Sequence, residues 1–64
     1  MKYTDLPASM TIRPVRCWLD DDRSTVYFVE WMPDGTDRVM FTREDDPKHF
    51  RQHVHGDRMT VVED

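Results

Sequence analysis

The sequence predicts a small α+β domain: a three- to four-stranded antiparallel sheet with one helix packed on one face, in the order β-β-β-α-β. Three observations lead to this prediction. Two alternating apolar segments flank a Pro-Asp-Gly turn, a later segment has the signals of a short helix, and 64 residues suffice for a single domain, 1–64. A chain of this length buries only about 60% of its unfolded surface. Its one cysteine allows no internal disulfide.

The central hairpin is predicted over residues 25–32 and 37–43. Pro33 presets φ for the first turn position and Gly35 takes the left-handed one, as in a three-residue loop with a type I turn. This register places Glu30 opposite Arg38, a favourable pair of charges. With a strand at 11–19, one sheet face then carries the predicted core: Tyr27, Val29, Trp31, Val39, Phe41, Val15, Cys17 and Leu19.

The flanking segments are less regular than the hairpin. Pro14 cannot donate to a strand ladder, so the strand at 11–19 should lie at an edge or carry a bulge. Residues 20–23 are expected to form a polar loop, and residues 1–9 either a mobile arm or a loosely docked edge. A helix is predicted from Asp46-Pro47 through Val54, ending at Gly56, with Phe50 and Val54 facing the sheet. A last short strand follows over 58–62.

The opposite sheet face is also rich in apolar residues, and a single helix cannot cover both faces. Either the N-terminal arm or simple half-burial accommodates this face, or it binds a partner or a second copy of the chain. Trp18, Phe28 and Met40 are the proposed apolar interface in the second case. The face as a whole carries Ile12, Trp18, Val26, Phe28, Met32 and Met40, diluted by Arg16, Glu30 and Arg38.

Acidic residues are clustered along the chain, and the formal net charge is −4. A negative surface repels nucleic acid and attracts a basic partner. Carboxylates along loops can imitate a row of phosphates, although acidic loops also simply keep a small domain soluble. The expected contact residues are Asp20, Asp21, Asp22, Glu44, Asp45 and Asp46.

No constellation of residues predicts catalysis. His49 and His53 are one helical turn apart, and His55, Asp57 and Cys17 complete a conceivable zinc set, but no Cys-x-x-Cys pair accompanies them. Neither Cys17 nor the serines Ser9 and Ser24 have an arranged base. Basic residues interleaved with Trp18 could stack single-stranded nucleic acid, but the net charge opposes this. The sequence therefore predicts a non-enzymatic protein without cofactor, metal or direct nucleic-acid binding.

In size, single-domain character, clustered acids and lack of an active site, the chain resembles the small acidic inhibitors of phages and mobile elements, anti-CRISPR proteins among them. This resemblance implies stoichiometric inhibition of a basic host protein that handles nucleic acid. The alternative is a small structural or assembly module that associates through Trp18, Phe28 and Met40. One unpaired cysteine and no apolar run of membrane-spanning length predict a cytoplasmic protein. A monomer is favoured, with a homodimer as the alternative.

Overall fold

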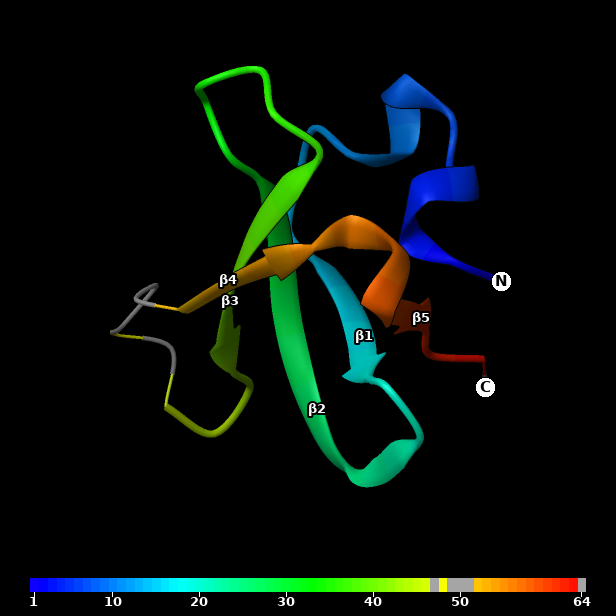
Figure 1. Ribbon diagram of the computed structural model, residues 1–64. Helices are drawn as coiled ribbons and strands as arrows, with labels where there is room; N and C mark the ends of the chain where they lie inside the picture. Colours follow the sequence, from blue (N-terminus) through cyan, green and yellow to red (C-terminus); the bar gives the residue numbers. More distant parts are fainter. Residues whose placement is uncertain (47, 49–51, 64) are drawn as a thin grey trace.

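The computed structural model describes residues 1–46, 48 and 52–63, which fold into one curled antiparallel sheet, a half-barrel (Figure 1). Strands β1 to β4 form a meander, and β5 returns beside β1, which gives the order β4-β3-β2-β1-β5. The ten-residue strand β2 is the longest and lies at the centre of the sheet. The strands are β1 (Val15–Leu19), β2 (Asp22–Trp31), β3 (Arg38–Arg43), β4 (Gln52–His55) and β5 (Met59–Val61).

The predicted α+β fold with a helix on the sheet is wrong. The end of the predicted helix, including Val54, forms strand β4, while Pro47 and residues 49–51 lie outside the described residues. Val54 pairs with Val39, and a β-branched side chain suits that position. A helix of about nine residues is marginal in water, so pairing with β3 wins. Among the described residues the helical elements are three 3-10 turns, η1 (Tyr3–Asp5), η2 (Ala8–Met10) and η3 (Gly56–Arg58). None of these described helices is long and apolar enough to cross a membrane.

The central hairpin is present, with the predicted faces but a different register. Val29 pairs with Phe41 and Glu30 with Met40, so the predicted pairs Val29–Val39 and Glu30–Arg38 do not form. The amide of Met32 donates to the carbonyl of Arg38 over 3.1 Å, which leaves a longer loop than predicted. The shift is two residues, and since side chains alternate with a period of two, each side chain keeps its face. Gly35 has the predicted left-handed conformation, with φ 77°.

The connection from β1 to β2 is tighter than the predicted polar loop over 20–23. Leu19 pairs with Asp22, so only Asp20 and Asp21 lie between the strands. Asp20 takes a positive φ of 51°, which aspartate tolerates better than most residues. The register of β1 against β2 shifts between Cys17 and Leu19, as in a β-bulge. The irregularity expected in this strand therefore occurs, but after Pro14, which precedes β1.

The inner face of the half-barrel holds the core, and the N-terminal segment covers it. We call residues 1–6, which include η1, the strap. Tyr3 of the strap is fully buried and its ring centroid lies 5.1 Å from that of Trp31. Lys2 forms a β-bridge with Thr60 on strand β5. The strap thus lies where the helix was expected. The buried core consists of Tyr3, Cys17, Val29, Val39, Phe41 and Met59.

Candidate protein-interaction surface

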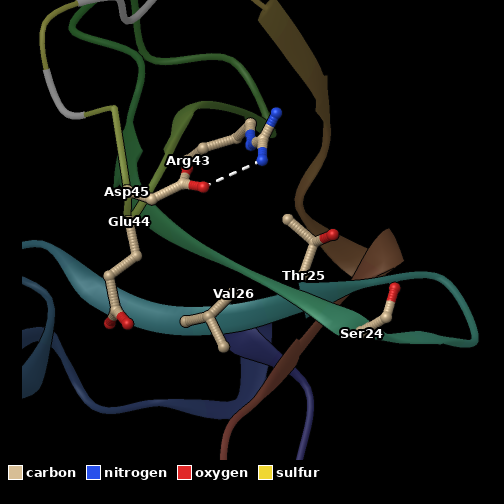
Figure 2. A pocket seen from close by; sticks show the side chains of 6 residues that line it. All are labelled: Ser24, Thr25, Val26, Arg43, Glu44 and Asp45. Carbon is tan, nitrogen blue, oxygen red and sulfur yellow. Dashed lines mark hydrogen bonds and ion pairs between the residues drawn. The ribbon is translucent and has the colours of Figure 1, made fainter.

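The two acidic clusters, 20–22 and 44–46, lie at the same end of the sheet. Strand β2 starts at Asp22, within the first cluster, and strand β3 ends just before the second cluster, where Arg43 pairs with Tyr27 of the antiparallel strand β2. The amide of Glu44 donates to the carbonyl of Val26 over 2.9 Å. A shallow groove lies beside the second cluster, between the end of β3 and the part of β2 that follows the first cluster (Figure 2). It is lined by Ser24, Thr25, Val26, Arg43, Glu44 and Asp45.

Within the first cluster the three aspartates differ in their surroundings. The guanidinium of Arg58 donates to both carboxylate oxygens of Asp20, over 3.0 and 2.6 Å, and these hydrogen bonds lower the pKa of Asp20. Asp22 accepts from the hydroxyl and the amide of Ser24, which lowers the pKa of Asp22. Asp21 is exposed and makes no hydrogen bond or ion pair with the described residues. Asp21 is therefore the carboxylate most available to a partner.

The second cluster is also interleaved with arginines. Both carboxylate oxygens of Glu44 accept from Arg16, which reaches across strand β2 from β1. Arg43 pairs with Asp45 over 2.9 Å, on the opposite side of the strand from the Glu44 side chain (Figure 2). These are surface pairs, whose side chains remain 40–68% exposed. Solvent screens such pairs, so they restrain the carboxylates only weakly.

Sequence reasoning located the acids but missed the arginines that accompany them. Arg58 is 38 residues from Asp20, and Arg16 is 28 residues from Glu44. Only Arg43, adjacent to the second cluster, could be identified from the sequence. Asp20, Glu44 and Asp45 therefore each have an arginine partner, and the local charge is less negative than the acids alone suggest.

The alternative apolar interface lies on the outer face of the sheet, opposite the core. Trp18, Phe28 and Met40 are all half-buried. The guanidinium carbon of Arg23 lies 4.5 Å from the centroid of the Trp18 ring. The ion pair between Arg16 and Glu44 crosses strand β2, which carries Phe28. Long charged side chains cover apolar surface in this way while their heads remain in water. The outer face is thus partly covered by its own arginines.

The candidate zinc ligands do not converge. Cys17 is fully buried in the core, whereas His53 and His55 are exposed on strand β4, and strands β3 and β2 separate β4 from β1. His49 lies outside the described residues. Over residues 1–46, 48 and 52–63, no group of three or more His, Cys, Asp or Glu side chains could hold a metal ion. Burial also raises the pKa of the Cys17 thiol to about 12, which makes it a poor nucleophile.

The largest exposed apolar side chains belong to the N-terminal segment, and sequence reasoning missed two of them. Met1 is 61%, Met10 57% and Ile12 81% exposed. Met10 and Ile12 follow the strap and precede strand β1, in a stretch bounded by Pro7 and Pro14. Ile12 was expected on the outer sheet face, but it lies outside the strands.

Comparisons with known proteins leave the functional argument to this geometry. No family model matches the chain, and neither a curated protein nor a solved structure matches it.

Proposed function

We propose that this protein is a non-enzymatic inhibitor that binds a basic, nucleic-acid-handling protein through the acid-rich end of its sheet. The observation that carries the proposal is that two acidic clusters, distant in sequence, lie at one end of the sheet, with Glu44 joined to strand β2 four residues after Asp22. Carboxylates displayed on adjacent strand ends offer a rigid, extended negative surface. Basic grooves that hold nucleic acid are complementary to such a surface.

The ion pairs refine which acids contact the partner. Asp21 presents an uncompensated charge, and the carboxylate of Asp22 is held by Ser24, a neutral group. Asp20, in contrast, is held by Arg58 at the turn and contributes to the structure there. Asp21 and Asp22 should therefore contribute more to binding than Asp20. Glu44 and Asp45 contribute when a stronger basic group displaces their arginines.

Charge reversal tests this proposal. Asp21→Lys removes an uncompensated contact charge and should greatly reduce recovery of a basic partner from host lysate at low salt. Asp5→Lys makes the same change of charge on the strap, at an exposed acid that makes no ion pair with the described residues, and serves as the matched control. Added DNA should compete with the partner, and raising the salt from 0.1 M to 1 M shortens the Debye length from ~10 Å to ~3 Å and should release it. Equal recovery with both variants would refute the role of the acidic end.

A second candidate function is association through the outer face, as a structural or assembly module. The supporting observation is that the strap packs against the core on the inner face, while Trp18, Phe28 and Met40 remain half-buried on the outer face. Association of this kind buries apolar surface and resists salt. Sedimentation of Phe28→Ser beside the wild type distinguishes it: a salt-resistant dimer lost in the variant supports the module, and a dimer retained in the variant contradicts it.

A further inference from the structure

The core of the half-barrel is incomplete without the strap. Tyr3 is the largest fully buried side chain, and it packs at 5.1 Å and 56° against the ring of Trp31. The strap also fills space at Gly56, where a Cβ atom would stand 3.1 Å from the Cγ2 of Thr4. A chain whose strap left this position would expose the inner face, so some strap must always occupy it.

The strap is attached to the sheet as an added edge segment. Lys2 bridges Thr60 in antiparallel fashion, and the amide of Val61 donates to the carbonyl of Met1 over 2.8 Å. Strand β5 is the edge of the sheet on this side. Backbone pairing at a sheet edge does not depend on whether the added segment belongs to the same chain. The strap of a second copy can therefore make the same contacts.

A hinge connects the strap to strand β1. We define the hinge as residues 7–14. Its hydrogen bonds with the described residues are all local. The Met10 amide donates to the Pro7 carbonyl over 2.9 Å, and the amide and hydroxyl of Thr11 donate to the Ala8 carbonyl over 3.1 and 3.0 Å. Pro7 and Pro14, at its two ends, have no amide hydrogen to give to the sheet. Eight residues reach about 26 Å when extended. The hinge can open without breaking any hydrogen bond that joins it to the described strands.

We propose that two copies of this chain exchange their straps, so that Tyr3 of each copy completes the half-barrel of the other. The strap's contacts are the same in the closed monomer and in the exchanged dimer, and only the hinge differs, which makes exchange a low-cost route to a dimer. Two opened hinges cross near the two-fold axis. Met10 and Ile12, exposed in the monomer, can bury against their counterparts there, and this gain exists only in the dimer.

A redox-controlled lock tests the exchange. The double variant Lys2→Cys, Thr60→Cys places cysteines at the two positions of the β-bridge. Oxidation of the dilute protein should form a disulfide that holds the strap on its own sheet. Cys17 is fully buried and does not compete for the disulfide. In sedimentation at rising protein concentration the locked form should stay monomeric. The same protein after reduction should show a dimer fraction that increases with concentration.

A mixing experiment gives an independent reading that does not depend on the lock. Lys2→Cys and Thr60→Cys, purified as separate proteins, are mixed under mild oxidation, and exchange should give a covalent heterodimer through the bridge position. Lys2→Cys mixed with Asp45→Cys is the control, because the Asp45 side chain is 68% exposed and lies in the acidic cluster after β3, away from β5. The first mixture should give several-fold more heterodimer than the control.

The outcomes separate this proposal from its competitors. A dimer that persists in the locked form would place the interface elsewhere, on the outer face for example, and would overturn the exchange. A reduced protein that remains monomeric at every concentration, together with equal heterodimer yields in the two mixtures, would overturn it as well. Loss of partner binding in Asp21→Lys bears only on the acidic end, so failure of one proposal leaves the other intact.

Discussion

Removing the Tyr3 side chain should bring the protein close to its limit of stability. Truncation of a buried aromatic residue to Ala costs about 3–5 kcal/mol, and about 0.5–1.5 kcal/mol of this is the contact between the rings of Tyr3 and Trp31. A domain of 64 residues has a total free energy of unfolding of roughly 3–10 kcal/mol. Tyr3→Ala is therefore expected to lose a third or more of the free energy of unfolding. If the wild-type value lies at the lower end of this range, the variant should lose all of it.

Tyr3→Phe separates the ring from the hydroxyl. The hydroxyl is buried without a hydrogen-bond partner among the described residues, and burial raises its pKa to about 12. A buried polar group without a partner costs about 1–3 kcal/mol, so Tyr3→Phe should be at least as stable as the wild type. Urea unfolding followed by tryptophan fluorescence measures both variants, since Trp31 lies against the ring.

Two results would refute this reasoning. If Tyr3→Ala unfolded at the wild-type urea concentration with an unchanged m-value, the strap would not be part of the cooperative fold. If Tyr3→Phe lost more than about 1 kcal/mol, the hydroxyl would have a partner in solution.

Three further predictions concern stability. Burial raises the pKa of Cys17 from 9.0 and of Tyr3 from 10.0, each to about 12. The free energy of unfolding should therefore be unaffected below pH 9 and fall above it, by about 1.4 kcal/mol per pH unit for each group that ionises in the unfolded chain. In urea titrations at rising pH, the onset of this loss should move from about pH 9 in the wild type to about pH 10 in Cys17→Ala. Gly35→Ala should cost about 1–2 kcal/mol in thermal or urea unfolding because φ is 77°, whereas Gly35→Asn should cost less, and equal losses would contradict the turn argument. Gly56→Ala should be destabilising and should be partly rescued by Thr4→Ser, which removes the methyl group 3.1 Å from the new Cβ; no rescue would mean that the strap does not set the cost.

The sequence allowed the faces of the sheet to be predicted, but not what covers them. Alternation in β2 and β3 assigned Val29, Val39 and Phe41 to one face, and all three are buried. A period of two is a strong local signal and survives even the two-residue error in register. The helix was predicted from a cap, a proline and two apolar residues four apart, whereas pairing with a distant strand determines the conformation of Val54. Tyr3 lies in a segment without periodicity, so its burial had no local signal.

The candidate site shows the same division between local and distant information. The acidic clusters are contiguous in sequence and could be identified directly. Their position at the same end of the sheet follows from the antiparallel pairing of β2 with β3, which the predicted hairpin implied. The pairing of Asp20 with Arg58 depends on β5 returning beside β1, a topological feature that no local pattern of 64 residues specifies.

The position of β5 beside β1 also bears on the order in which the chain can fold. The β1–β2 and β2–β3 hairpins join residues close in sequence, whereas Cys17 pairs with Val61, and Lys2 with Thr60, across most of the chain. Contacts of high sequence separation form slowly because loop closure must come first. The meander is therefore expected to assemble early, with Val29 and Val39 still exposed, and to wait for β5 and the strap to close together. That half-formed sheet, rather than the unfolded chain, is the species on which proteases and aggregation would act.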